Sequence, residues 1–253
     1  MLRAIRLKLF QQMPNYRKPS SFTVKESFPL PPYSTVIGMV HSACDFKEYH
    51  PMRISIQGNH ASDIADIETQ YVFGENWGKS DKESSHQHRI ISKENPTGYK
   101  VIDSPKSIQF LTDVELCIHI VPENPEDLET IYNGLLNPKE YISLGRREDI
   151  ARIDEVKKVD LEEIIINDED DFDEYVITKY SAYCPFSYME DISHGDINGT
   201  VYKIPKVFDT TSKLRKWKKV IPVRYLPKDI EVPTKLLNNE NVFLDNDICV
   251  FLA

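Results

Sequence analysis

Alternating apolar and polar positions predict several strands in the first 150 residues. Apolar side chains at positions 5, 7 and 9 alternate with Arg6 and Lys8, which is the two-residue period of a strand with one covered face. The same alternation predicts strands at 52–56 and 114–121, and an extended run follows the first of these at 64–73. A short apolar run at 141–144, ended by Gly145, predicts the last strand of this part.

A helical period predicts two helices between these strands. Apolar residues recur at helical spacing from Val36 to Cys44, after two prolines and Ser34 as a candidate N-cap. The second helix is predicted after Asn124, with Pro125 at its first position and a buried stripe from Leu128 to Leu135. The elements therefore run strand, helix, strand, strand, strand, helix, strand.

This order predicts an α+β fold, a ferredoxin-like or RRM-like sandwich, if one of the two middle runs belongs to an insertion. A polar stretch at about 74–112 carries little core material, and a long insertion of this kind is usually functional or disordered. Short strand-like runs between prolines and turns predict a smaller β-rich C-terminal part. The expected parts are a domain at 1–153 with its insertion, an acidic connecting segment at 154–174 and the C-terminal part at 175–253.

The negative charge is concentrated in one segment. The chain carries a net charge of −9, and residues 154–174 alone contribute eleven acids against two bases, so the remaining chain is neutral. A neutral remainder is free to gather a basic face, and KLRKWKK at 213–219 is its densest basic cluster. That cluster is either a solvated surface or a patch that follows a nucleic-acid backbone, with Trp217 for stacking. The acidic segment is either a solvated linker or a surface that repels RNA or meets a basic partner.

Several classes of protein are not indicated. No apolar run approaches the length of a membrane span, and the charged N-terminal segment does not resemble a signal peptide, so we expect a cytoplasmic protein with no membrane partner. The four cysteines lie far apart without a CxxC pair, which predicts neither a disulfide framework nor a zinc ribbon. His41 and Cys44 have helical spacing but lack further ligands, so no metal and no cofactor is expected.

Two stretches resemble a known family. They are YRKPSSFTVKESFPLPPYSTVIGMVHSA at 16–43 and YISLGRRED at 141–149. Together they resemble the fifth Cas protein family, the RAMP-superfamily subunit of type I CRISPR surveillance complexes (Cascade), most closely its type I-B branch. The resemblance covers the first 150 residues, and the C-terminal third only by length and general character.

The resemblance implies a non-catalytic subunit for antiviral defence. Such a subunit binds the 5′ handle of mature CRISPR RNA (crRNA) and caps the filament of backbone subunits beside the large subunit, which inspects target DNA. It also implies an RRM-like core with a β-hairpin thumb, and the polar insertion lies where that thumb belongs. The implied partners are therefore crRNA, the backbone subunit, the large subunit and, indirectly, target DNA.

The first stretch has the chemistry for an unpaired RNA end. Cations on phosphates, hydroxyl donors and aromatic faces hold splayed nucleotides, and prolines keep such a loop extended. The candidate RNA-binding residues here are Tyr16, Arg17, Lys18, Ser20, Ser21 and Phe22. Each is also an ordinary loop position by itself, and either aromatic alone would favour core packing.

The second stretch adds Gly145, Arg146 and Arg147. The glycine allows close backbone approach or a positive φ, and the arginines suit bidentate phosphate contacts. Internal pairing of Arg147 or Arg152 with Glu148 or Asp149 is an equal alternative, and Arg146 is favoured for RNA because it adjoins the glycine. His86, His88 and Arg89 are candidate thumb contacts, although such histidines in a polar loop are usually only solvated.

A ribonuclease is the alternative function, because one type I-C relative of the family processes precursor crRNA. Metal-independent cleavage of RNA needs a base, an acid and a cation near the scissile phosphate. His41, Tyr33 and Lys18 are the candidates for these roles. A single histidine on a helix is more often a packed or surface residue, so we expect no catalysis.

Overall fold

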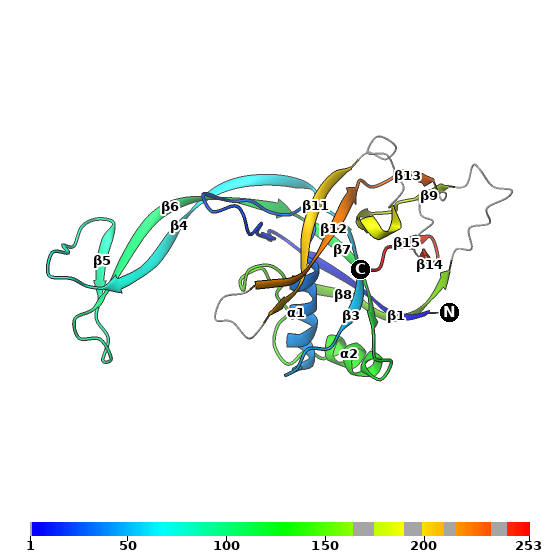
Figure 1. Cartoon of the computed structure of the whole chain (residues 1–253), viewed down its shortest axis with the longest axis horizontal. Coiled ribbons are helices and arrows are strands. Elements are labelled where there is room, and N and C mark those ends of the chain that lie inside the picture. Colours follow the sequence, from blue (N-terminus) through cyan, green and yellow to red (C-terminus); the bar gives the residue numbers. More distant parts are fainter. Residues whose placement is uncertain (1, 164–174, 190–198, 210–215, 234–241) are drawn as a thin grey trace.

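The computed structural model describes residues 2–163, 175–189, 199–209, 216–233 and 242–253. Figure 1 shows a body made of one twisted sheet with two helices beneath it, and a long arm that projects from one end. None of the helices in these ranges is long and apolar enough to cross a membrane.

Four strands and two helices form the centre of the body. The strands are β1 (Leu2–Gln11), β3 (Met52–Asn59), β7 (Val114–Pro122) and β8 (Arg152–Glu163). They lie in the order β3-β7-β1-β8, and every neighbouring pair is antiparallel. Along the chain, helix α1 (Tyr33–Cys44) lies between β1 and β3, and α2 (Asp127–Leu136) lies between β7 and β8. The predicted α+β class is confirmed.

The last central strand differs from the prediction. The run at 141–144 is a loop with one isolated bridge, between Ser143 and Ile150. The last central strand is instead β8, most of which lies in the predicted connecting segment. The many acidic residues of this strand made it resemble a linker in the sequence. In the structure they face basic residues of β1, as in the pairs Arg3–Asp160 and Arg6–Glu155. Opposite charges on neighbouring strands stabilise a sheet. The rest of the acidic segment, 164–174, lies outside the described residues.

Further strands extend the sheet on both sides. The full order is β11-β12-β10-β3-β7-β1-β8-β14-β15. The added strands are β10 (Ser181–Pro185), β11 (Thr200–Asp209), β12 (Lys216–Leu226), β14 (Phe243–Asp245) and β15 (Ile248–Val250). A short 3-10 helix η1 (Phe186–Tyr188) and the pair β9 (Tyr175–Ile177) and β13 (Glu231–Pro233) complete this region. Strands from the β-rich C-terminal region therefore continue the central sheet.

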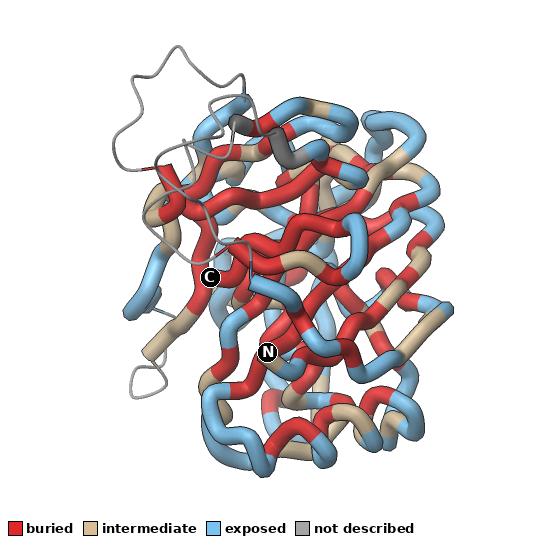
Figure 2. Tube along the Cα trace, turned by 90° about the vertical axis from the view of Figure 1, so that its right-hand side faces the viewer, coloured by how far each residue is buried: buried red, intermediate tan, exposed pale blue. Residues whose placement is uncertain are grey.

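The main core lies between the sheet and the helices. Figure 2 shows the buried residues concentrated along the central strands. Ile5, Leu7, Ile54 and Ile118 are fully buried against α1 and α2, and each such side chain contributes about 1.5–3 kcal/mol by leaving water. The helices begin close to their predicted positions, although Pro32 rather than Ser34 is the N-cap of α1 and Glu126 rather than Asn124 that of α2.

The opposite face of β1 is also covered, which the prediction of one covered face missed. Arg6 is buried there and donates to Glu155 Oε1 and to Asp245 Oδ2, both at 2.7 Å. His119 Nε2 lies 2.9 Å from the same Asp245 oxygen. Burial alone would raise the pKa of Asp245, but hydrogen bonds from His119 and Arg6 outweigh burial and lower it. This ionic cluster attaches the β14–β15 hairpin to β1 and β7.

The arm is a long hairpin of β4 (Ser62–Asn76) and β6 (Tyr99–Thr112), with β5 (Gln87–Ile90) added near its far end. The run at 64–73 therefore belongs to the insertion and not to the central sheet. Strand β2 (Val24–Lys25) pairs with β6 in parallel at the base of the arm. Ile67, Tyr71 and Phe73 are exposed along it, at 72%, 60% and 71%.

Candidate RNA-binding groove

The segment after β1 is an ordered hairpin. The backbone N–H of Phe28 donates to Tyr16 O at 2.8 Å, and that of Lys18 donates to Glu26 O at 2.9 Å. Arg17 and Ser27 form an isolated antiparallel bridge between these two hydrogen bonds. Side chains in such a ladder alternate between its two faces. The hairpin therefore turns Tyr16 towards the core and leaves Arg17 exposed.

The structure contradicts the predicted stacking role of Tyr16. Its ring is only 1% exposed, and its hydroxyl donates to Gln11 Oε1 at 2.6 Å. Burial raises the pKa of this hydroxyl well above its ordinary value. The ring therefore has no open face for a base. Phe22, by contrast, is 77% exposed at the tip of the hairpin.

The other predicted residues of this hairpin remain at the surface. Lys18 Nζ lies 3.1 Å from Glu26 Oε2 and 5.8 Å from the centroid of the Tyr202 ring. Ser20 is exposed, and the Ser21 hydroxyl donates to the carbonyl oxygen of Val24. Ser21 therefore supports the turn, while Lys18 faces the C-terminal strands.

Asp149 joins the two sequence motifs. One of its carboxylate oxygens, Oδ2, accepts from the backbone N–H of Asn15 at 3.1 Å and from that of Arg146 at 2.8 Å. The Arg146 guanidinium also donates to Oδ1 at 2.7 Å, and the Asp149 side chain is 1% exposed. Asn15 continues the connection by donating to Lys25 O and Gln109 O. We call this set of contacts the Asp149 latch.

The latch explains the glycine and corrects the preference for Arg146. Gly145 has φ +112°, and a Cβ there would lie 2.7 Å from Asp149 Oδ2, so only glycine fits without strain. Arg146 also contacts Glu148 at 3.2 Å and lies 4.7 Å from the Phe110 ring centroid. Its guanidinium is therefore occupied by the protein. The internal pairing with Glu148 and Asp149 that was predicted for Arg147 or Arg152 is made by Arg146 instead, and Arg152 pairs with Asp154.

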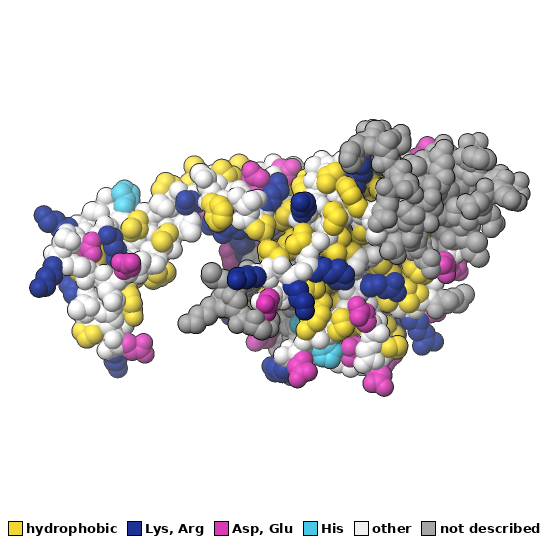
Figure 3. Space-filling model, in the orientation of Figure 1, with side chains coloured by type: hydrophobic (Ala, Val, Ile, Leu, Met, Phe, Trp, Pro, Cys, Tyr) yellow, Lys and Arg dark blue, Asp and Glu magenta, His cyan; other side chains and the backbone are white. Residues whose placement is uncertain are grey.

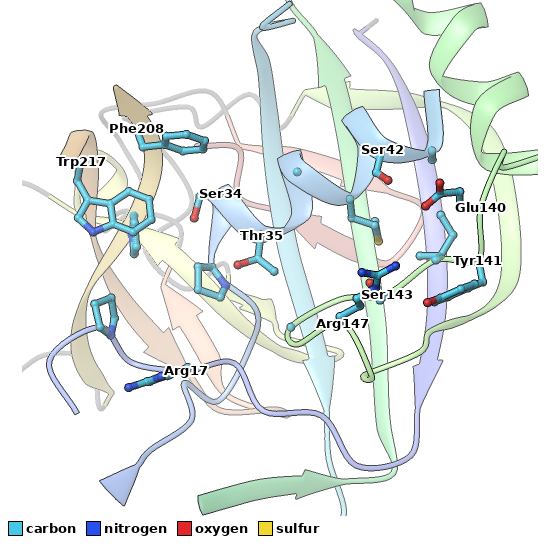
Figure 4. Close-up of a pocket in the computed structure, with 18 residues that line it drawn as sticks. Arg17, Ser34, Thr35, Ser42, Glu140, Tyr141, Ser143, Arg147, Phe208 and Trp217 are labelled. Carbon is cyan, nitrogen blue, oxygen red and sulfur yellow. The ribbon is translucent and has the colours of Figure 1, made fainter. Parts of the chain in front are cut away.

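A hollow of about 570 Å³ opens where both motifs meet the C-terminal strands. We call it the central hollow. Figure 4 shows Arg17, Phe208 and Trp217 on one side of α1 and Tyr141 and Arg147 on the other. Its lining is formed by Arg17, Pro19, Pro32, Ser34, Thr35, Gly38, Met39, Ser42, Ala43, Glu140, Tyr141, Ile142, Ser143, Gly145, Arg147, Pro205, Phe208 and Trp217. Thus, three distant segments build one concave surface.

Small residues of α1 form the floor of the central hollow. Ser34, Gly38 and Ser42 recur every four residues and therefore lie on one face of the helix. Glycine inside a helix costs about 1 kcal/mol relative to alanine. Apart from Gly38 itself, its two chain neighbours and the adjacent helix backbone, no atom lies within 4 Å of the position that a Cβ of Gly38 would occupy. The small residues keep this face open, and the N-terminal end of the helix, where backbone N–H groups favour anions, borders the hollow.

Two arginines supply positive charge to the central hollow. Within the described part of the chain, neither Arg17 nor Arg147 has an acidic partner within salt-bridge distance. A hydrogen bond to Tyr141 raises the pKa of Arg147. Glu140 is the acidic residue of the lining. Figure 3 shows further Lys and Arg side chains on the body beside the base of the arm and at the far end of the arm. The site therefore suits an anionic ligand.

The basic cluster at 213–219 contributes Trp217 to the lining of the central hollow. Residues 213–215 lie outside the described residues, whereas Lys216 to Lys219 are exposed at the start of β12. Trp217 is 38% exposed and packs edge to face on Phe208, with ring centroids 6.3 Å apart. Its position in the hollow was not predicted, because the sequence gives no sign that β11 and β12 lie beside α1.

The candidate catalytic residues do not converge. Tyr33 is fully buried at the start of α1, and burial raises the pKa of its hydroxyl well above the ordinary value. His41 lies eight positions further, about 12 Å along the helix. Its Nδ1 lies 2.8 Å from Ile37 O, and its Nε2 accepts from the backbone N–H of His50 at 3.0 Å. Both ring nitrogens are occupied, and Lys18 is in the separate hairpin.

The three candidate thumb residues lie on the arm. His86 and His88 are exposed and face Asp103, at 3.7 Å and 3.3 Å. Arg89 Nε donates to Thr97 O at 2.8 Å within the arm. Among the residues described, no group of three or more His, Cys, Asp or Glu side chains is arranged to hold a metal ion.

The fold matches a chain of a solved structure described as "CRISPR RNA-guided surveillance complex". The TM-score is 0.52 and the identity 19%, and the match covers 92% of each chain. A "CRISPR protein from Archaeoglobus fulgidus" matches with a TM-score of 0.45 and 12% identity, over 100% of this chain and 99% of that one. A chain of the "Type III-B Cmr-beta bound to cognate target RNA and AMPPnP" matches with a TM-score of 0.45 and 18% identity, over 90% and 85%. No curated protein matches the sequence.

The first of these matches shows that the chain shares the α+β fold of that chain. The sequence is more specific. Residues 4–221 match the family described as CRISPR-associated protein (Cas_Cas5). The chain belongs to this family, as its two motifs predicted.

Proposed function

We propose that this protein is a non-catalytic RNA-binding subunit of a type I-B Cascade complex, that it holds the 5′ handle of mature crRNA, and that it acts in antiviral defence in the cytoplasm. The observation that carries the proposal is the central hollow, where the two family motifs place Arg17 and Arg147 on either side of α1. Cations and backbone N–H groups bind phosphates, and Tyr141 and Trp217 offer rings to unpaired bases.

The proposed architecture has a ferredoxin-like core. The order β8-β1-β7-β3, with a helix after β1 and another after β7, supports this assignment. The arm then corresponds to the thumb. We retain the predicted division into three parts as a proposal, but we move the end of the first domain from 153 to 163 so that it includes β8. The connecting segment is then 164–174, and the last part stays at 175–253.

The proposed partners are the backbone subunit, at the filament end that this protein caps, and the large subunit, through which target DNA is inspected. Exposed apolar side chains on the arm support a protein partner there, because a projecting hairpin with rings in water gains free energy when another surface covers them.

Removing the two arginines of the central hollow tests RNA binding. The guide RNA is first isolated with the purified complex and sequenced. Its 5′-terminal segment of about twelve nucleotides is then synthesised and serves as the probe. Arg17→Ala and Arg147→Ala should each weaken binding. Each should also make the slope of log K against log salt concentration shallower by about 0.7, because a protein that lacks one arginine neutralises one phosphate fewer and so displaces fewer counterions from the RNA. Fluorescence anisotropy at several salt concentrations measures both quantities.

Arg152→Ala is the matched control. Arg152 is exposed at 67% but pairs with Asp154 at 2.6 Å, away from the central hollow. Its loss should leave the salt slope within error. Equal slopes for all three variants and the original protein would exclude the central hollow from the RNA path.

Absence of catalysis is tested separately. The full chain should leave a repeat hairpin RNA intact after long incubation without metal, because His41, Tyr33 and Lys18 do not converge. Cleavage that His41→Ala abolishes would instead establish the ribonuclease alternative.

A further inference from the structure

A second hollow adjoins the central hollow and shares a wall with it. We call it the side hollow, and its volume is about 390 Å³. The shared wall consists of Pro19, Pro205 and Trp217, which line both hollows. The side hollow is further lined by Lys18, Ser20, Phe28, Val201, Tyr202, Lys203 and Val220. A chain that leaves the central hollow over this wall therefore enters the side hollow directly.

The indole of Trp217 is held in place without being covered. Its edge-to-face contact with Phe208, at 6.3 Å and 89° between ring planes, fixes its orientation. The side chain nevertheless remains 38% exposed, so a large aromatic surface stays in contact with water. A flat ligand that covers it would gain free energy and would pay little entropy to order the ring.

The side hollow combines apolar walls with ammonium groups. Phe28 and Tyr202 pack edge to face, with centroids 5.9 Å apart, and Val201 and Val220 are exposed beside them. Lys18 Nζ lies 5.8 Å from the Tyr202 centroid, and Lys203 is exposed on β11. Apolar walls with a few placed charges are typical of sites for small planar ligands. A nucleobase has the matching chemistry, since its faces are apolar and its sugar carries a phosphate.

We propose that the side hollow binds one nucleobase of the RNA strand whose neighbouring nucleotides occupy the central hollow. Trp217 is the ring on which that base stacks, and Lys18 and Lys203 contact its phosphates. The inference rests on the proposed function, because it requires RNA in the central hollow. It adds a specific subsite to that function. In this subsite, Trp217 lies between the bound base and the neighbouring nucleotides and keeps them apart.

Tryptophan fluorescence reports on this subsite directly. The chain has two tryptophans, and Trp77 is on the arm, where its backbone N–H donates to Gly98 O. In a Trp77→Phe protein, all tryptophan emission comes from Trp217. Addition of the single-stranded guide RNA segment should quench that emission at saturation, because a stacked base quenches an indole. Unchanged emission while anisotropy shows bound RNA would overturn the subsite.

Affinity measurements separate stacking from charge. Trp217→Ala should weaken RNA binding about 5- to 150-fold, the range of 1–3 kcal/mol for one stacked base, and the salt slope should not change because no charge is lost. Trp217→Phe should keep most of the affinity and shows that the fold tolerates the site. Leu136→Ala, at an exposed apolar position at the end of α2, is the control with no expected effect.

An abasic scan identifies the nucleotide and distinguishes the two proposals. One position of the RNA should lose affinity when its base is removed, and Trp217→Ala should add nothing to that loss. If the RNA does not bind the original protein at all, the proposed function itself fails. If RNA binds with its salt slope intact and additive losses at every position, only the subsite is overturned. A Trp217→Ala variant that binds RNA normally but loses a protein subunit would show that the side hollow accepts protein.

Discussion

Neighbouring residues of one motif have different functions in this protein. In LGRRED, Gly145 allows close packing, Arg146 and Asp149 hold two loops together, and Arg147 faces the central hollow. The sequence predicted that this motif and the YRKPSS stretch act together, but it could not distinguish Arg146 from Arg147. That distinction depends on which guanidinium meets the buried carboxylate. Tyr16 was misassigned for a similar reason, because alternation within a hairpin is not visible in an irregular sequence.

Loss of the Asp149 charge should destabilise the protein. Asp149→Asn should lower the free energy of unfolding by about 3 kcal/mol, because it leaves the Arg146 guanidinium and two backbone N–H groups without their carboxylate. Urea unfolding followed by circular dichroism measures the change. Glu148→Gln is the control: Glu148 contacts the same guanidinium but is 64% exposed, so its loss should cost less than about 1 kcal/mol. Equal effects would mean that the latch does not stabilise the fold.

His41 should make stability depend on pH. Burial lowers the pKa of His41 below 6.5, even though its hydrogen bond to Ile37 O acts in the opposite direction. The unfolded chain therefore binds a proton more readily than the folded protein, so stability is retained above pH 6.5 and falls as the pH decreases below it. Protonation would also remove the acceptor that His41 Nε2 offers to the N–H of His50.

The urea midpoint measured at several pH values tests this dependence. The original protein should lose more stability than His41→Leu between about pH 7 and pH 5. His50 and Asp127, which lie 2.9 Å apart, are present in both proteins. Parallel pH curves would show that His41 does not couple to folding.

The arm and β8 show where the pattern of apolar and polar residues fails to predict the environment of a strand. The polar insertion was predicted from composition, but the arm begins at Ser62 and not near Gly74. Its first strand resembled a core strand because Ile67, Tyr71 and Phe73 are apolar, although they are exposed. Conversely, β8 resembled a linker because it is rich in acids. In both cases, the neighbouring chain determines the environment, and a single sequence does not contain that information.

The far part of the arm should be removable. Phe73 and Val101 are direct partners on β4 and β6, so residues 74–100 can be replaced by Asn-Gly, which forms a two-residue hairpin turn. The free energy of unfolding should change by less than about 1 kcal/mol, because the removed part has no contact with the main core. A loss of several kcal/mol in urea unfolding would contradict this. The same variant lacks His86, His88 and Arg89, so its RNA affinity tests their predicted contacts.

The net charge of the whole molecule does not indicate the charge of the candidate site. The net charge of −9 argues against nucleic acid, yet the central hollow contains two arginines without acidic partners in the described chain. Separating the acidic segment from the remainder predicted that a basic surface was available. The position of that surface was not predictable, because it depends on residues 17, 147 and 217, which only the continuous sheet brings together.

Protein synthesis imposes an order on the ionic cluster that attaches the β14–β15 hairpin to β1 and β7. Arg6 and Asp245 are 239 positions apart, so a ribosome that adds 5–20 residues per second produces the carboxylate roughly 10–50 s after the guanidinium. During that interval, the apolar surface that Phe243 and Val250 later cover around Ala4 remains open. The nascent chain therefore exposes this apolar surface until the β14–β15 hairpin has been synthesised.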